Sequence, residues 1–276
     1  MSLSIASSTE IAPGVRMPML GFGTYKSADG PEVYGSVRAA LEIGYRGVDT
    51  ASLYENEQGV GRALRDSGLA REDLFVATKV WNDDQGFEGT VAACERSLRL
   101  LGLEHVDLYM VHWPSRELMA DTWRAMELLL ARGRTRAIGV CNHLPHHVRA
   151  LLAVAEVPPA VDQVEHHPWL QRRELRTYCR EAGITMQAWA PVMRGRVGEV
   201  PELVRIAAAH AKTPAQVSLR WMLQHGVSAL PKSVHHDRIV ENADVFDFDL
   251  SADEMRTIDA ISVELRLGKD PDEFFW

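Results

Sequence analysis

The chain has 276 residues, of which 46% are hydrophobic and 25% are charged, and a formal net charge of −8. This balance is that of a globular protein with a large core, and the length predicts a single α/β barrel domain over residues 1–276. The negative charge argues against nucleic acid or an anionic membrane as a partner. Neither a secretory signal nor a transmembrane run is evident, and Cys94, Cys141 and Cys179 are too scattered to predict a disulfide framework. We therefore expect a cytoplasmic protein.

Short apolar runs of the kind that form buried parallel strands alternate with helical patterns from about residue 18 to residue 232. Successive strand ends such as Asp49 and Lys79 lie 30 positions apart, which is close to the length of one β-α-β unit. The predicted strands are Met19–Phe22, Arg46–Asp49, Leu74–Lys79, Val106–His112, Arg136–Val140, Ala160–Glu165, Thr185–Trp189 and Val227–Leu230.

Helices are predicted between these strands and after them. Thr213 is an expected N-cap before Pro214, and Ser251 with Glu254 forms a capping-box pattern. The predicted helices cover Pro31–Glu42, Val91–Leu101, Thr122–Ala131, Pro214–Gln224 and Ser251–Ile261. Eight strands with intervening helices predict a (β/α)8 TIM barrel with a C-terminal helix and short active-site loops. An open doubly wound sheet is the alternative, because alternation alone does not fix closure. Residues 266–276 are expected to form a loop over one barrel mouth.

Four polar residues stand at or just after the ends of neighbouring predicted strands. Asp49 ends the second strand, Tyr54 follows it in the loop, Lys79 ends the third strand and His112 ends the fourth. In such a barrel these positions build the active site. Taken singly, each residue has an ordinary structural interpretation: an ion pair, an aromatic lid or a core histidine. Together they favour a catalytic site.

These residue types suit the reduction of a carbonyl group. The developing alkoxide needs a proton donor, and Tyr54 is a candidate whose pKa a nearby ammonium, Lys79, would lower. Asp49 would keep Lys79 charged, and a neutral His112 would orient the carbonyl oxygen. Spacing alone shows only that the four side chains can converge.

Three separated motifs resemble those of the aldo-keto reductase superfamily, and the resemblance covers nearly the whole chain. The motifs are Gly44-Tyr45-Arg46-Gly47-Val48-Asp49-Thr50-Ala51 with Tyr54-Glu55-Asn56-Glu57, Ile138-Gly139-Val140-Cys141-Asn142, and Leu230-Pro231-Lys232-Ser233 with Arg238, Glu241 and Asn242. Within the superfamily the chain is similar to the bacterial branch typified by 2,5-diketo-D-gluconate reductases. The resemblance implies an NADPH-dependent monomer in which Asp49, Tyr54, Lys79 and His112 form the catalytic tetrad, with Tyr54 as general acid. The implied substrates are small aldehydes, α-dicarbonyls, keto-sugars or keto-acids.

The resemblance also implies the binding residues. For the cofactor they are Gly23, Thr24, Asp49, Asn142, Gln163, Trp189, Ala190, Val192, Leu230, Lys232, Ser233, Val234, Arg238, Glu241 and Asn242. For the substrate they are Tyr25, Trp81, His112 and Trp113, with Phe274, Phe275 or Trp276 as further aromatic walls. Lysine and arginine beside a small hydroxyl also suit a phosphate dianion on physical grounds, which favours NADPH over NADH. Cys141 and Asp162 depart from the family, which often has serine and asparagine there.

Other signals carry less weight. The glycine run at Gly21 fails the dinucleotide fingerprint because Lys26 stands where its last glycine belongs. The pair His166-His167 is interpreted as core packing, because adjacent histidines on a strand point to opposite faces. The pairs at 146–147 and 235–236 are expected at the surface, and no metal site is predicted. A metal-dependent hydrolase is disfavoured because Lys79 would repel the cation. The alternative function is an NADPH-binding, redox-sensing regulatory subunit with little turnover.

Overall fold

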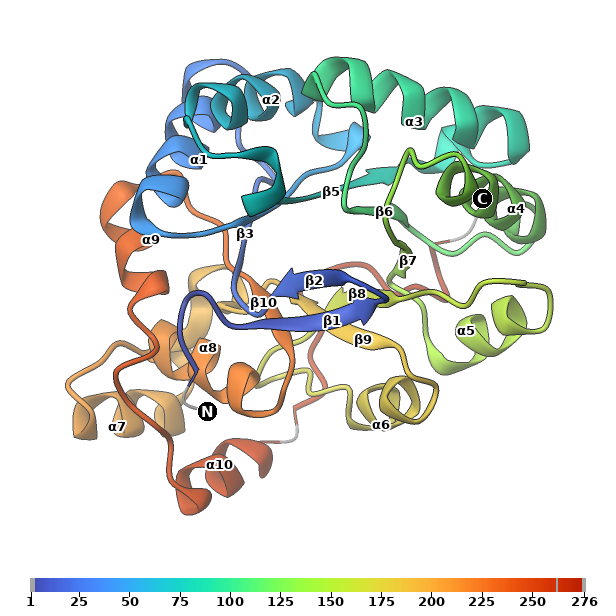
Figure 1. The fold of residues 1–276 in the computed structure, drawn as a ribbon. Helices are drawn as coiled ribbons and strands as arrows, with labels where there is room; N and C mark the ends of the chain where they lie inside the picture. Colours follow the sequence, from blue (N-terminus) through green and yellow to red (C-terminus); the bar gives the residue numbers. More distant parts are fainter. Residues whose placement is uncertain (1–2, 262, 275–276) are drawn as a thin grey trace.

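Eight parallel strands form a barrel surrounded by helices in the computed structural model, which describes residues 3–261 and 263–274 (Figure 1). The strands follow one another around the barrel in chain order: β3 (Gly21–Gly23), β4 (Gly47–Asp49), β5 (Phe75–Val80), β6 (Leu108–Val111), β7 (Ile138–Cys141), β8 (Val161–Glu165), β9 (Thr185–Trp189) and β10 (Ser228–Leu230). The Ala229 N–H donates to the Met19 carbonyl at 2.9 Å, and a parallel bridge joins Leu20 to Ala229. The first and last strands therefore meet. This confirms the barrel and excludes the open sheet.

The helices pack outside the strands, as the alternation predicts. They are α1 (Pro31–Ile43), α2 (Glu57–Asp66), α3 (Phe87–Leu101), α4 (Met119–Ala131), α5 (Pro145–Leu152), α6 (Arg173–Glu181), α7 (Pro201–Ala209), α8 (Pro214–Gln224), α9 (His236–Ala243) and α10 (Ala252–Asp259). The predicted caps form, since the side chain of Thr213 accepts from the N–H of Gln216 and Ser251 accepts from Glu254. No helix in the described part of the chain is long and apolar enough to cross a membrane.

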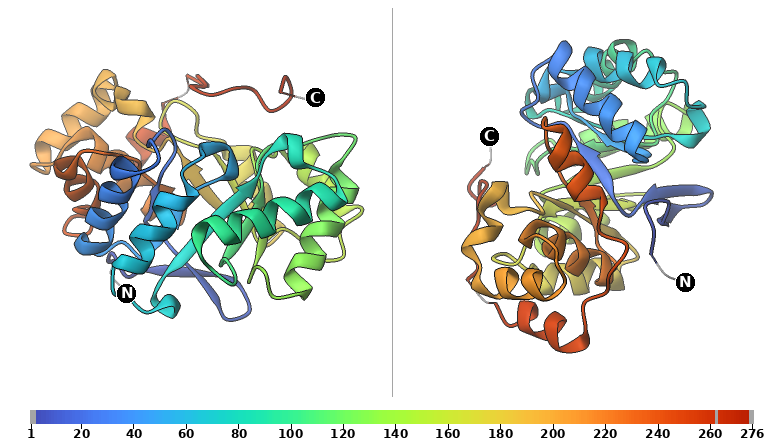
Figure 2. Two further views of the ribbon diagram at one scale, coloured as in Figure 1. Left: turned by 90° about the horizontal axis from the view of Figure 1, so that it is seen from above. Right: turned by 90° about the vertical axis from the view of Figure 1, so that its left-hand side faces the viewer.

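An N-terminal hairpin, absent from the predicted elements, closes one end of the barrel. It consists of β1 (Ser8–Ala12) and β2 (Val15–Pro18), paired antiparallel. Val15 and Met17 are buried and belong to the same apolar cluster as the inward-facing residues of the barrel strands. The left view of Figure 2 shows the hairpin below the barrel and the C-terminal segment above it. Ligands therefore have access from the opposite end, where the strands finish.

Candidate active site

A cavity of about 1100 Å³ opens at the carboxyl ends of the strands. It is lined by residues from the strand ends, from the loops that follow them and from the C-terminal segment. They include Gly23, Tyr25, Asp49, Tyr54, Trp81, His112, Trp113, Asn142, Gln163, Trp189, Ala190, Val192, Leu230, Lys232, Ser233, Arg238, Glu241, Asn242 and Phe274. The volume exceeds what a small substrate alone needs.

An ion pair lies at the floor of this cavity. Lys79 is completely buried, and its Nζ donates to Asp49 Oδ1 at 2.5 Å and to the Thr50 carbonyl at 2.9 Å. The Tyr54 hydroxyl lies 3.5 Å from the same Nζ. Neighbouring β4 and β5 place the carboxylate and the ammonium side by side, and the short helix η1 (Ser52–Tyr54) brings the phenol back over them. The structure thus joins three of the four predicted catalytic side chains.

The environment of these groups sets their protonation. Burial is the largest single effect and would lower the pKa of Lys79, but the charge of Asp49, its hydrogen bond, and the effects of Tyr54 and Cys141 together outweigh it, so the pKa is raised and the ammonium persists. Burial raises the pKa of Tyr54, while Lys79 lowers it by a smaller amount. Lys79 thus acts in the expected direction, but burial is the larger effect, so the pKa of Tyr54 in the free site is raised overall. Tyr54 remains protonated at neutral pH, as a proton donor must.

His112, the residue directly after β6, completes the group. Its ring lies 5.7 Å from the ring of Tyr54 and 5.1 Å from that of Trp81, edge-on in both cases. Burial lowers its pKa well below the ordinary value, and the Lys79 charge adds to this effect. The imidazole is therefore neutral at pH 7, the form that can hydrogen-bond a carbonyl oxygen without competing for its proton.

Three further predicted residues, Asn142, Gln163 and Trp189, make side-chain hydrogen bonds beside the ion pair. Gln163 Nε2 donates to Asp49 Oδ2 at 2.8 Å and to the neighbouring Gln187 at 2.8 Å. Trp189 Nε1 donates to Asn142 Oδ1 at 2.9 Å, and Asn142 Nδ2 donates to the His112 carbonyl. Asn142 has a φ of 60°, a left-handed conformation that asparagine tolerates better than most residues. The amide of Asn142 is therefore oriented by partners on two other strands.

The opposite end of the cavity is basic. Lys232 and Ser233 follow β10, and Arg238 lies in the first turns of α9. Neither Lys232 nor Arg238 pairs with a carboxylate within the described residues; Lys232 instead donates to the Lys26 carbonyl at 3.1 Å. Burial lowers the pKa of Lys232; the charge of Glu32, which makes no hydrogen bond or ion pair with it, opposes this effect, and the charge of Lys26 adds to it. Two cations without carboxylate partners are suited to an anionic ligand.

Two predicted cofactor residues do not line the cavity, and several unpredicted ones do. Thr24 is completely buried behind it, where its hydroxyl donates to the Asp49 carbonyl at 3.0 Å, and Val234 is also absent from the lining. The unpredicted lining residues are Lys26, Leu53, Pro191, Arg194, Gly195, Val197, Ala215, Leu267, Gly268 and Lys269. Arg194 has a left-handed backbone conformation (φ 53°) and is followed by a glycine, but nothing in the sequence alone indicated that this loop would line the cavity. Phe275 and Trp276 lie outside the described residues.

Asn56 explains why the loop that carries Tyr54 folds as it does. Its buried amide donates to the carbonyls of Thr24 and Ser27 at 3.0 and 2.9 Å, and its Oδ1 accepts from the Thr50 hydroxyl at 2.7 Å. One side chain therefore joins the loops after β3 and β4. The first motif that resembles the family, which ends in Tyr54-Glu55-Asn56-Glu57, thus contains in Asn56 a residue that holds the loops together.

The comparisons with known proteins agree with this geometry. The model of the Aldo/keto reductase family matches residues 19–263. The chain belongs to the aldo/keto reductase family. It is 49% identical over 276 residues, with all of both chains covered, to a protein named glyoxal reductase from Bacillus subtilis (strain 168). It is 42% identical to a putative methylglyoxal reductase from Salmonella typhi, over 93% of this chain and 94% of that protein.

A solved neighbour carries the cofactor. A mutant of Gox0644 in complex with NADPH superposes with a TM-score of 0.90 at 39% identity, covering 96% of this chain and 97% of that chain. Together with the family match, these relatives show that the present chain is an NADPH-dependent carbonyl oxidoreductase. This favours an enzymatic function over the alternative of a redox-sensing regulatory subunit. The cavity fits that cofactor, because cations without carboxylate partners occupy one end and the amides of Asn142 and Gln163 lie at the other.

The histidine pairs of the sequence take part in packing, in the first turn of a helix and at a helix N-cap. His166 is buried, and its ring stacks on that of Trp221 at 5.1 Å. His167 is also buried, and its Nε2 lies 3.0 Å from Glu165 Oε1. His146 and His147 stand in the first turn of α5, and His235 is the N-cap residue of α9. The interpretation of His166-His167 as core packing matches these positions.

Proposed function

We propose that the enzyme reduces small carbonyl compounds, α-dicarbonyls such as glyoxal and methylglyoxal foremost, with Tyr54 as general acid. The observation that carries this proposal is the chain from Asp49 through the Lys79 ammonium to the Tyr54 hydroxyl at the floor of the cavity. The names of the two relatives, glyoxal reductase and putative methylglyoxal reductase, support the substrate class. Other small aldehydes, keto-sugars and keto-acids belong to the same range.

The roles of the side chains follow from their protonation. Bound NADPH supplies a hydride to the carbonyl carbon. Tyr54, protonated at neutral pH, gives its phenolic proton to the carbonyl oxygen, and the adjacent Lys79 ammonium stabilises the phenolate that remains. Asp49 holds Lys79 charged and in place through the 2.5 Å contact. The neutral His112 donates a hydrogen bond that orients the oxygen before proton transfer.

The cofactor would occupy the cavity from its amide end to its basic end. Both N–H groups of Gln163 already have partners, which leaves its Oε1 as an acceptor for the nicotinamide carboxamide, beside Asn142. Trp189 would flank the nicotinamide ring. Lys232, Ser233 and Arg238 would bind the 2′-phosphate of the adenosine, which NADH lacks.

Aromatic side chains form the substrate end. Tyr25 packs against Tyr54 with ring centroids 5.0 Å apart, and Trp113 packs against Phe274 at 4.7 Å. These walls and Trp81 leave few polar groups besides Tyr54 and His112, so shape and the reacting carbonyl itself would dominate recognition. Specificity should therefore be broad among small carbonyl compounds.

The test is a direct assay of the purified protein. With methylglyoxal or a nitrobenzaldehyde it should oxidise NADPH, and NADH much more slowly. Tight NADPH binding without turnover on a broad carbonyl panel would contradict the proposal and favour the sensing function. We also propose that the enzyme acts as a cytoplasmic monomer; a molecular mass near 30.8 kDa in solution would support the monomeric state.

A further inference from the structure

The C-terminal tail, residues 265–274, crosses the open end of the barrel above the strand ends (Figure 2). Its Leu267, Gly268 and Phe274 line the cavity. The ring of Phe274 lies 4.7 Å from that of Trp113 and 6.5 Å from that of Trp81. The tail therefore supplies one wall of the space in which a carbonyl substrate would bind, and its position matters for binding.

Glu165, the last residue of β8, fastens the tail to the barrel. Its side chain is buried, and Oε1 accepts the N–H of Leu267 at 2.6 Å. The N–H of Gly268 donates to the same carboxylate at 3.2 and 3.1 Å, and His167 Nε2 lies 3.0 Å from it. Although burial acts to raise the pKa of Glu165, these neighbours lower it below its ordinary value, so the group is ionised at neutral pH. Charge-assisted bonds to two successive backbone N–H groups make this a strong attachment.

At the same point the tail touches Trp189. A Cβ placed on Gly268 would lie 2.4 Å from the Trp189 ring, so only glycine permits this approach. The Trp189 ring in turn donates to Asn142 at 2.9 Å. Glu165 thus fixes how closely the tail packs on a side chain that flanks the cofactor end of the cavity.

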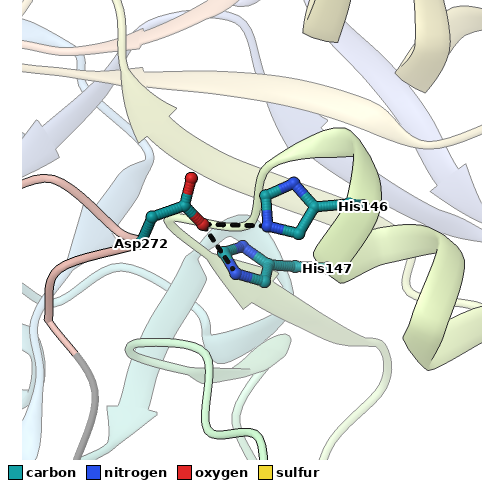
Figure 3. Close-up of side chains that lie close together, drawn as sticks. All are labelled: His146, His147 and Asp272. Atoms are coloured by element: carbon teal, nitrogen blue, oxygen red, sulfur yellow. Dashed lines mark hydrogen bonds and ion pairs between the residues drawn. The ribbon is translucent and has the colours of Figure 1, made fainter.

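A second, weaker attachment lies further along the tail (Figure 3). His146 Nε2 lies 2.8 Å and His147 Nε2 3.2 Å from Asp272 Oδ1. A metal ion would need a lone pair at each Nε2, but His147 Nδ1 accepts the Leu144 N–H at 3.1 Å, which places the proton of the neutral ring on Nε2. The cluster is therefore better explained as a contact that holds the tail. His146 and Asp272 are about half exposed, so this contact contributes less than the buried one.

We propose that Glu165 is a positioning residue that holds the C-terminal tail over the cavity and thereby sets the KM for the carbonyl substrate. It acts through the tail and does not reach the reacting atoms. The proposal rests on the carbonyl-reductase function proposed above. Loss of the carboxylate charge would leave the N–H groups of Leu267 and Gly268 facing a neutral amide that offers one acceptor oxygen, and the tail would lift away.

The kinetic test combines a substitution with a truncation. Glu165→Gln should raise the KM for methylglyoxal about tenfold, the cost of weakening one charge-assisted hydrogen bond, with kcat changed less than about twofold. Removal of residues 265–276 should raise KM at least as much. In the truncated protein, Glu165→Gln should have no further effect. Additive effects of the two changes would overturn the proposal, because they would mean that Glu165 acts independently of the tail.

A matched control and a measurement without turnover complete the design. Glu273→Gln removes an exposed carboxylate from the same tail and should leave KM unchanged. Trypsin should release the peptide after the exposed Lys269 faster in Glu165→Gln than in the wild type or in Glu273→Gln. Equal rates would refute the attachment, even for a protein that reduced no carbonyl. If Glu165→Gln does not fold, Gly268→Ala should lift the tail from Trp189 and give the same rise in KM and in cleavage; an unchanged KM and cleavage rate would contradict the proposal.

Discussion

Replacement of Tyr54 by phenylalanine should abolish most carbonyl reduction without unfolding the enzyme. The change removes one hydroxyl, whose closest polar partner, Lys79 Nζ, lies at the long distance of 3.5 Å. The ring keeps its contacts with Tyr25 and His112. The loss in the free energy of unfolding should therefore stay within about 1 kcal/mol, the value of a modest hydrogen bond.

The catalytic loss should be far larger than the stability loss. Removal of the group that transfers the proton typically lowers kcat by about 100- to 10,000-fold. Because Tyr54 contributes only one wall near the carbonyl, the Kd for NADPH should change less than about threefold. Steady-state NADPH oxidation with methylglyoxal gives kcat, quenching of tryptophan fluorescence gives the Kd, and thermal denaturation gives the stability.

Tyr34→Phe is the matched control for this experiment. Tyr34 lies in α1 away from the cavity, and its hydroxyl donates to Asp66 at 3.0 Å on the surface. The same atom is deleted there, so stability should fall slightly and kcat should not change. Retention of more than about a tenth of the wild-type kcat by Tyr54→Phe would refute the assignment of the proton donor.

Three further predictions concern the charges of the protein. Lys232→Ala and Arg238→Ala should each raise the KM for NADPH about tenfold and leave that for NADH unchanged, measured by initial rates with both cofactors. The pKa of Asp162 is raised well above 3.8, mainly by burial, so between that pH and the raised value the unfolded chain loses a proton that the folded chain keeps. The free energy of unfolding of the wild type should decrease across this window as pH rises, and the decrease should be smaller in Asp162→Asn. A difference in Tm between Asp162→Asn and the wild type that is the same at about pH 4 and about pH 8 would contradict this. Because the pKa of His112 is strongly lowered, kcat should show no ionisation near pH 6.5, and a step there in the pH profile would mean that the imidazole titrates.

Much of the barrel was predictable because its strands are buried on both faces and read as continuous apolar runs. Thr185–Trp189 has the predicted bounds, and most other strands differ by one or two residues at their ends. The convergence of Asp49 and Lys79 was predictable for the same reason, since neighbouring parallel strands end side by side. The hairpin at Ser8–Pro18 was not, because β1 is mostly half exposed and lacks a clear alternation, and β2 alternates between buried and exposed residues over only four positions.

Contacts between segments far apart in the chain could not be predicted. The carboxylate of Glu165 and the N–H of Leu267 are 102 positions apart, and nothing in either local pattern indicates the other. The same holds for Trp189 and Asn142, whose 2.9 Å contact depends on rotamers at two strand ends. Barrel strands fix where a loop begins, but the path of the loop depends on the side chains it meets.

The direction of the Tyr54 pKa shows why residue types alone give an incomplete account of the site. A lysine beside a tyrosine suggests a phenol with a lowered pKa, but the cavity that brings the two together also buries them, and burial is the larger effect on Tyr54. In the free site the phenol is held protonated, and Lys79 is held charged by Asp49. The ammonium then favours the phenolate only once the proton has begun to leave. The same burial that weakens Tyr54 as an acid at rest therefore keeps its proton available for the carbonyl oxygen, and it strengthens the interaction with Lys79 as negative charge develops.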